Sequence, residues 1–418
     1  MDNVKLPKQG RDWDSLRQEM LEFGRDDADW RSARTAVYVF HPGDEVLAVA
    51  QQAYALYQSE NALGPAAFPS LRRMESEVIS MGLGLLHGPE GACGNMTSGG
   101  TESILMAVKT CRDQARARGM DTRGAEILCP RSTHLAFDKA AQYFDLKTRR
   151  IPVASDLRAD VPALADAICE RTIMLVGSAP CFPFGLIDPI ESLSDLALER
   201  DLWLHVDACV GGYFAPFARM NGIPVPPFDF ELPGVSSISA DLHKYGYAAK
   251  GASTIFHRSE EQRAFQLFQC DEWMAGGMTT PTAAGTRPGG AVAGAWAVMN
   301  YLGEAGYCDK ARVVTDTRQR LMDAIDGMDG LRTFGDPQLG LFTYGAEDAD
   351  RLPIFAVWGE LKSRGWFTGL ITEPRGIHLM LSPSHADVAD QYLADLEDAV
   401  KQVREGGGRG GPARATYA

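Results

Sequence analysis

Short apolar runs and helical spacing alternate along the middle of the chain. Between residues 90 and 260, the short runs predict buried strands, and the segments with apolar residues every three to four positions predict helices. Strands joined by helices form a mostly parallel sheet covered on both faces. The sequence therefore predicts an α/β fold whose ligands bind beyond the carboxyl ends of the strands. The predicted strands are 126–129, 173–177, 202–207, 236–240 and 253–257, and the predicted helices are 103–118, 135–144, 161–171 and 189–200.

The flanking segments divide the chain further. Helical spacing returns at 46–57, 70–87 and 291–302, with Gly/Pro-rich breaks at 64–69 and 285–290. After residue 302 the pattern is helix, strand, helix, strand, helix, which predicts a smaller α+β domain. We expect an N-terminal segment over 1–60, a large domain over 61–302, the small C-terminal domain over 303–405 and a Gly-rich, disordered tail over 406–418.

Composition and charge narrow the classes of protein. The 418 residues are 45% hydrophobic and 23% charged, as expected for a globular protein with a large core. The net charge of −14 argues against a partner bound through nucleic-acid phosphates. The eight cysteines include no Cys-x-x-Cys pair, and no metal-ligand spacing occurs, so we expect reduced thiols and no metal. Without an apolar leader or an apolar run of ~18 residues, the sequence predicts a cytoplasmic protein with no transmembrane segment.

The stretch TSGGTES at 97–103 joins small residues to the start of a predicted helix. Amide groups at a helix N-terminus favour an anion, so this stretch predicts a phosphate site. An ordinary helix cap after a glycine turn is the simpler interpretation. The pattern is neither Gly-x-Gly-x-x-Gly nor Gly-x-x-x-x-Gly-Lys-Ser/Thr, which disfavours dinucleotides and nucleoside triphosphates.

An acid and a lysine also occupy strand ends. Asp207 closes the predicted strand of WLHVD, where a ligand would lie, although it could equally form a salt bridge. Lys244 follows a strand and a histidine in SADLHKYGYAAKG, and a desolvated lysine with a lowered pKa can form a Schiff base. Most lysines are surface charges, so Lys244 alone decides nothing. The turn GTRPGG at 285–290 could offer amides to a second phosphate face, or could be a plain loop.

A phosphate site, a strand-end acid and a lysine, in that order, match the needs of pyridoxal phosphate. This cofactor requires an amine for its aldehyde, an acid for its pyridine nitrogen and an anion site for its phosphate. The chain resembles the fold-type I pyridoxal-phosphate enzymes of the group II decarboxylase family, and among them the sphingosine-1-phosphate lyases. The resemblance covers roughly residues 38–400 and is dense in TSGGTESILMAVKTCRD, HVDACVGGYF, SISADLHKYGYAAKG and GTRPGG.

The resemblance implies roles for the residues that match the cofactor site. Lys244 matches the lysine that holds the cofactor, and Asp207 the acid that pairs with the pyridine nitrogen. His134, in RSTH, matches the histidine that stacks on the ring. Gly100 and Thr101 match part of the phosphate cradle.

Further matches complete the implied site. His243 matches the rest of the phosphate cradle, and Gly285 and Thr286 are expected from the partner subunit of a homodimer with shared sites. Lys250 matches a second lysine near the reaction centre. Tyr38 matches a tyrosine near the substrate phosphate. Either Lys250 or a tyrosine could be the acid–base group.

One position departs from the family pattern. The family carries Asn-Pro-Leu-His, with a histidine that binds the substrate's phosphate, where this chain has Asn61-Ala62-Leu63-Gly64. Either a neighbour such as His41 replaces that histidine, or the substrate differs from a long-chain-base phosphate.

The resemblance implies a lyase that cleaves phosphorylated long-chain bases by retro-aldol chemistry to a fatty aldehyde and phosphoethanolamine. A pyridoxal-phosphate-dependent amino-acid decarboxylase is the nearest alternative. A non-catalytic binding protein would not need Lys244, Asp207 and His134 together, and a nicotinamide dehydrogenase is disfavoured because the glycine fingerprint is absent.

Overall fold

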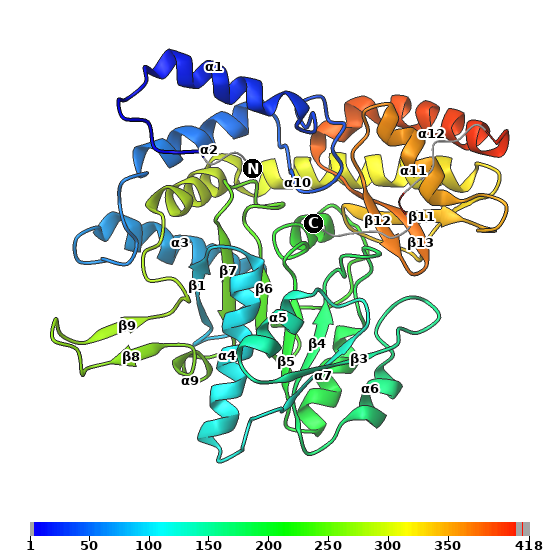
Figure 1. Ribbon diagram of the computed structural model, residues 1–418. Helices are drawn as coiled ribbons and strands as arrows, with labels where there is room; N and C mark the ends of the chain where they lie inside the picture. The colour runs from blue at the N-terminus through cyan, green and yellow to red at the C-terminus, as the bar shows by residue number, and fades with distance from the viewer. Residues whose placement is uncertain (1–3, 407–411, 413–418) are drawn as a thin grey trace.

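A seven-stranded sheet forms the centre of the protein, which we describe from a computed structural model over residues 4–406 and 412. Figure 1 shows helices on both sides of this sheet. The strand order is β1-β7-β6-β5-β4-β2-β3, and β7 is antiparallel to both of its neighbours while the other pairs are parallel. The predicted mostly parallel α/β fold is confirmed. The strands are β1 (Cys93–Thr97), β2 (Glu126–Pro130), β3 (Lys147–Ile151), β4 (Thr172–Ser178), β5 (Trp203–Asp207), β6 (Val235–Ala240) and β7 (Ser253–His257).

Both faces of the sheet are buried. Neighbouring strand residues belong to different apolar clusters, for example Leu175 to one and Val176 to the other. Successive strand side chains point to opposite faces, so each face has its own core. One cluster includes Phe137 of α5, and the other includes Leu193 of α7. The helices that follow the strands are α4 (Gly100–Ala117), α5 (Ala136–Tyr143), α6 (Val161–Ala167), α7 (Ile190–Glu199), α8 (Ala215–Met220) and α9 (Glu260–Ala264).

The N-terminal region and a long helix lie along one edge of the molecule (Figure 1). The helices predicted at 46–57 and 70–87 are present as α2 (Asp44–Leu56) and α3 (Pro69–Leu85), preceded by α1 (Trp13–Phe23) and the 3₁₀ turn η1 (Gly24–Asp26). The helix predicted over 291–302 is the first part of α10 (Gly289–Asp326), which continues beyond a kink at Gly303 with φ +56°. Glycine tolerates this left-handed conformation, which explains why the helical pattern breaks there.

The C-terminal part has the predicted mixture of helices and strands. An antiparallel sheet of order β10-β11-β13-β12 packs with helices at one end of the molecule. Its elements are β10 (Leu331–Thr333), β11 (Leu341–Ala346), α11 (Ile354–Ser363), β12 (Gly369–Thr372), β13 (Arg375–Met380), the 3₁₀ turn η2 (Pro383–Val388) and α12 (Ala389–Arg404). The domain boundary at 302/303 remains a proposal.

Two smaller features complete the fold. A hairpin of β8 (Phe268–Cys270) and β9 (Met278–Thr280) projects from the large part of the molecule (Figure 1). Of the helices that the structure describes, none has the length and apolar character needed to cross a bilayer. The tail predicted to be disordered falls almost entirely on residues 407–411 and 413–418, which lie outside the described residues.

Candidate active site

One cavity of about 530 Å³ lies at the carboxyl ends of the central strands, where the sequence predicts ligand binding. It adjoins the end of β5 and the residues that follow β6. Its wall draws on segments from Tyr38 to Met380, so distant parts of the sequence meet there. Of the ten predicted site residues, eight line it: Tyr38, Gly100, Thr101, His134, Asp207, His243, Lys244 and Lys250.

The first turn of α4 offers backbone amides to this cavity. Residues 98–102 line it, and the helix begins after Gly99 without a side chain that caps its N–H groups. Gly100 has no room for a side chain, since a Cβ there would lie 2.7 Å from Cys209 Sγ and 2.8 Å from Asp241 Oδ2. Uncapped amides at a helix N-terminus bind anions, so this turn suits a phosphate group.

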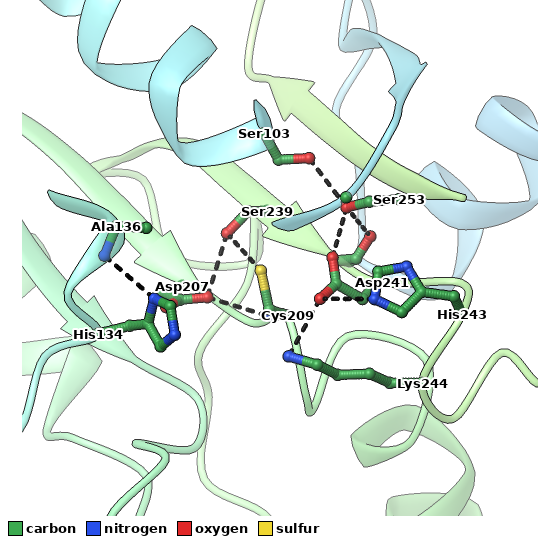
Figure 2. A network of polar contacts seen from close by, with 12 residues as sticks. Ser103, His134, Ala136, Asp207, Cys209, Ser239, Asp241, His243, Lys244 and Ser253 are labelled. Atoms are coloured by element: carbon green, nitrogen blue, oxygen red, sulfur yellow. Dashed lines mark hydrogen bonds and ion pairs between the residues drawn. The ribbon is translucent and has the colours of Figure 1, made fainter. Parts of the chain in front are cut away.

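Asp207 is buried at the end of β5 and held through one oxygen. The Cys209 amide donates to Oδ1 at 3.1 Å, and the Ser239 hydroxyl donates to the same oxygen at 3.3 Å (Figure 2). None of the hydrogen bonds among the described residues uses Oδ2. The carboxylate is therefore fixed on one side and has an oxygen left for a group in the cavity.

Lys244 forms an ion pair with Asp241, whose Oδ2 lies 3.0 Å from Nζ (Figure 2). Burial alone would lower the pKa of Lys244, but the charge of Asp241, with smaller contributions from Cys209 and Asp207, raises this pKa above its ordinary value. Burial would likewise raise the pKa of Asp241, but Lys244 and His243 hold it below its usual range. Without the cofactor, Asp241 thus outweighs desolvation, and the pKa of Lys244 is raised and not lowered.

Lys250 is a second cation, on the exposed side of the cavity. Its ammonium donates to the Tyr38 carbonyl at 2.8 Å and to the His243 carbonyl at 3.3 Å. Partial burial and the charge of Lys244 lower the pKa of Lys250 to about 8. The backbone of Tyr38 has φ +63°, a left-handed conformation that is rare for large side chains and frequent at functional sites. A lysine with this pKa can exchange protons near neutral pH.

Two histidines present neutral rings to the cavity. His134 Nδ1 accepts a hydrogen bond from the Ala136 amide at 3.1 Å, so the ring proton resides on Nε2. His243 Nδ1 donates to the Ala252 carbonyl at 2.7 Å, and its Nε2 lies 3.7 Å from Asp241 Oδ2. Burial lowers the pKa of both rings below the ordinary histidine value. A neutral ring of this kind can stack on a flat ligand.

Gly285 and Thr286 are not among the described residues that line the cavity of their own chain. Their turn instead packs on Asn61, whose side chain donates to Thr286 Oγ1 at 3.2 Å and accepts from the Arg287 amide at 3.3 Å. The Ala62 amide also donates to the Arg287 carbonyl at 3.0 Å. The turn and the loop that begins at Asn61 therefore form one local unit.

Gly64 lies in the same loop, and it too is absent from the cavity wall. A Cβ at Gly64 would lie 3.8 Å from Ala67 Cβ and 4.0 Å from the Asn61 carbonyl oxygen, so a side chain fits there. His41, the suggested substitute, lines a neighbouring cavity of about 530 Å³. Its Nε2 lies 3.3 Å from Asp44 Oδ1. His41 thus lies in a cavity that shares Phe40, His243 and Lys250 with the site, and its replacement of the missing histidine stays a prediction.

The structure places two buried acids at the site that the sequence does not single out. Asp241 is the partner of Lys244, and the signal for it was an acid three positions before the lysine. Glu102 accepts the Ser98 amide at 2.6 Å through one oxygen and the Ala283 amide at 2.8 Å through the other. Glu102 thus fastens the loop before Gly285 to the start of α4. Its signal was an acid in the first turn of a helix, which is too common to stand out.

These residues fit pyridoxal phosphate. Lys244 offers the amine, Asp207 the acid and the start of α4 the anion site, all on the wall of one cavity of small-molecule size. The missing Cβ at Gly100 keeps the cradle open between the helix start and Cys209. The fold and the site together define a pyridoxal-phosphate-dependent enzyme.

Comparison with known proteins agrees with this class. The Pyridoxal-dependent decarboxylase conserved domain matches residues 5–334, and the chain belongs to this family. It is 42% identical over 406 residues to the sphingosine-1-phosphate lyase of Arabidopsis thaliana, a match that covers 96% of this chain and 74% of that protein. It is 33% identical to a probable L-tyrosine/L-aspartate decarboxylase of Methanocella arvoryzae, over 84% of this chain and 90% of the relative.

A solved structure gives the same result. The sphingosine-1-phosphate lyase of Burkholderia pseudomallei superposes with a TM-score of 0.92 at 36% identity, over 96% of this chain and 94% of the other. The fold predicted from the resemblance, a pyridoxal-phosphate enzyme with a mostly parallel sheet, is confirmed. The predicted cofactor is confirmed as well.

Proposed function

We propose that the protein is a carbon–carbon lyase that cleaves phosphorylated long-chain amino alcohols to a fatty aldehyde and phosphoethanolamine. The observation that carries this proposal is the kind of cation on the cavity wall, which also carries the acids Glu102, Asp207 and Asp241. Its described lining residues include the lysines Lys244 and Lys250 but no arginine. A decarboxylase must hold a substrate carboxylate, for which the arginine fork is well suited, whereas an ammonium can serve as a point charge for a phosphate.

The proposed roles follow from the positions of the side chains. Lys244 holds the cofactor, Asp207 pairs with its ring nitrogen and His134 lies on the ring face. The start of α4 binds the cofactor's phosphate, and His243, whose Nδ1 proton is donated to the Ala252 carbonyl, donates to that phosphate when Nε2 is also protonated. When bound, pyridoxal phosphate supplies an electron-accepting ring that stabilises the negative charge left on C2 after the C2–C3 bond breaks.

The reaction also needs proton transfer and a grip on the substrate's phosphate. A base must take the proton of the 3-hydroxyl group, and an acid must return a proton to C2. Lys250, with a pKa of about 8, can do both near neutral pH. Tyr38 is joined to Lys250 through its carbonyl and lines the same cavity, so we assign its side chain to the substrate's phosphate.

Amino-acid decarboxylation is the second candidate, and one observation favours it. Gly64 replaces the histidine that the lyase pattern uses for the substrate's phosphate, and no side chain of the cavity wall stands in for it at that loop. A carboxylate substrate would not need that histidine. The similarity to a relative named as a probable L-tyrosine/L-aspartate decarboxylase also supports this alternative.

A substrate comparison separates the two candidates. Purified protein loaded with pyridoxal phosphate is given sphinganine 1-phosphate, sphinganine, L-tyrosine or L-aspartate, with Lys244→Ala protein as the blank. We expect aldehyde from the phosphorylated base, with kcat/KM about 100-fold above that for sphinganine because the phosphate makes charge-assisted hydrogen bonds. Carbon dioxide from an amino acid, without aldehyde from the phosphorylated base, would establish the decarboxylase instead.

The proposal extends to assembly and location. We propose a homodimer with shared sites, supported by the position of Gly285 and Thr286 outside the cavity of their own chain. We also propose a cytoplasmic location. All eight cysteines lie in the described residues and none is in a disulfide, as suits a reducing compartment.

A further inference from the structure

A column of polar side chains crosses the inside of the central sheet and ends at Asp207. Trp203 and His205 precede Asp207 on the same face of β5, and Ser237 and Ser239 lie beside them on β6. The strand register pairs His205 with Ser237 and Asp207 with Ser239. The side chains between them, Leu204 and Val206 for example, belong to the apolar cluster of the opposite face.

The column is fully buried, which makes its polar character informative. His205, Ser237 and Ser239 each have 0% of their surface exposed. A buried polar group without a partner is costly, and apolar side chains would fill the same space without that risk. Each member has a partner here, so the column is a complete network between two neighbouring strands.

The hydrogen bonds of the column have one direction, which the carboxylate fixes, since Asp207 Oδ1 can only accept and the Ser239 hydroxyl donates to it. Trp203 Nε1 can only donate, and it donates to Ser237 Oγ at 2.8 Å. The hydroxyl proton of Ser237 is then free to point at His205 Nδ1, which lies 2.7 Å away. Burial lowers the pKa of His205 to about 4, so the ring is neutral. Because Ser239 gives its own proton to Asp207, it can only accept from His205, which places the ring proton on Nε2.

The second half of the column continues toward the cavity. His205 Nε2 lies 3.2 Å from Ser239 Oγ and donates to it. The Ser239 hydroxyl then donates to Asp207 Oδ1 at 3.3 Å. The Cys209 amide holds the same oxygen, and the two contacts fix the plane of the carboxylate (Figure 2). Every donor between Trp203 and Asp207 therefore points toward the acid.

We propose that Trp203, Ser237, His205 and Ser239 form a relay that positions Asp207 for the ring nitrogen of pyridoxal phosphate. These four are positioning residues, since each acts through its neighbour and Asp207 alone meets the cofactor. The relay rests on the proposed role of Asp207. Through the relay, Trp203 and Ser237, which lie inside the sheet away from the cavity, would influence whether the ring nitrogen of the cofactor is protonated.

The test removes the hydroxyl group of one relay serine at a time. Ser239→Ala removes the donor to Asp207. Ser237→Ala touches neither Asp207 nor the cavity, but it removes the donor to His205 Nδ1. Ser236→Ala is the matched control, because this buried serine lies next to Ser237 on the opposite face of β6. Folding of each variant is checked by the thermal midpoint of the cofactor-free protein.

Two readouts other than turnover are measured: the dissociation constant of pyridoxal phosphate, and the NMR shift of its ¹⁵N-labelled ring nitrogen in the bound state. We expect Ser239→Ala and Ser237→Ala each to weaken binding about tenfold and to move the shift toward the unprotonated ring, since each loses a hydrogen bond in a chain ending on a charge. Ser236→Ala should match the wild type. Ser239→Thr, which keeps the hydroxyl, should restore both readouts.

Two results would be decisive against parts of this scheme. If Asp207→Asn changes affinity and shift while Ser239→Ala and Ser237→Ala change neither, the relay is overturned and Asp207 keeps its role. If Asp207→Asn also leaves both unchanged, the role of Asp207 itself fails. Should one serine variant not fold, His205→Leu decides the matter, because its side chain cannot donate to Ser239 and its shift is expected to move toward the unprotonated ring. A wild-type affinity and shift in this variant would overturn the relay.

Discussion

Lys244 and Asp241 meet at 3.0 Å, and this contact governs how the lysine becomes reactive. The carboxylate favours the ammonium form, which has no lone pair to attack an aldehyde. The same carboxylate lies against Gly100, so it also borders the proposed phosphate cradle. We therefore expect Asp241 to affect how readily Lys244 reacts with the cofactor, a role that the sequence does not indicate.

Asp241→Asn should change the pH at which the cofactor attaches. The carboxylate raises the pKa of Lys244, so its loss lowers that pKa, and the neutral amine is then present at lower pH. The rate of pyridoxal phosphate attachment to cofactor-free protein, followed by absorbance across a pH series, should rise at lower pH in the variant than in the wild type. If the rate of attachment depends on pH in the variant as it does in the wild type, Asp241 does not set the pKa of Lys244.

Lys244 is expected to be the lysine joined to the cofactor. Borohydride reduction of the loaded protein followed by peptide mapping should place the label on Lys244. Lys244→Ala should abolish turnover yet leave the thermal midpoint of the cofactor-free protein within a few degrees, since the side chain is not part of the apolar core. Label on Lys250 would contradict the assignment.

At the scale of elements, the pattern of apolar residues predicts the buried strands and the helices between them. It misses β1, whose CGNMT is poor in β-branched residues, and β3, whose KTRRI reads as a charged segment. β3 is an edge strand with exposed positions, and edge strands can carry charge. The predicted helix at 161–171 ends earlier, at Ala167, because the chain then turns into β4.

The loop around Gly64 offers a test of the substrate class. On the proposed shared site, in which this loop and the 285–290 turn face the partner's cavity, Gly64→His should tighten binding of phosphoethanolamine or a phosphorylated base by about ten- to a hundredfold, since a histidine donor to a phosphate is a charge-assisted hydrogen bond. The backbone there leaves space for the side chain. Product inhibition by phosphoethanolamine measures the change, and Gly64→Ala is the control for added bulk. Weaker inhibition in Gly64→His than in Gly64→Ala would mean that another group fills the space.

At the scale of the whole molecule, the site is assembled from distant segments, and this is where prediction from sequence depends on motifs. Lys244, Asp207 and His134 lie on one cavity wall because strand ends meet at one edge of a parallel sheet, which the strand pattern predicts. Asp241 and Glu102 could not be assigned in advance, since their partners are known only once loops are placed. Gly285 and Thr286 lie away from that wall, and their expected contribution from a second subunit stays a prediction.

A shared site predicts complementation between damaged chains. Lys244→Ala removes the lysine, and Thr286→Pro disturbs the turn that the partner's cofactor is expected to meet. Mixed after mild dissociation, the two inactive variants should regain up to about a quarter of wild-type activity, since random pairing makes about half of the dimers mixed and each mixed dimer holds one intact site. The activity is measured on the mixture and again after separation of the mixed dimer by a tag, when it should reach about half of the wild-type activity because one of its two sites is intact. A purified mixed dimer without activity would exclude sharing.

The reaction itself can be tested in one measurement. Loaded enzyme is mixed with sphinganine 1-phosphate in deuterium oxide, and the products are analysed by mass spectrometry. A C2–C3 cleavage followed by protonation at C2 predicts a fatty aldehyde and phosphoethanolamine with one deuterium bound to carbon. Unchanged substrate in this mixture, with carbon dioxide released from an amino acid by the same preparation, would contradict the lyase.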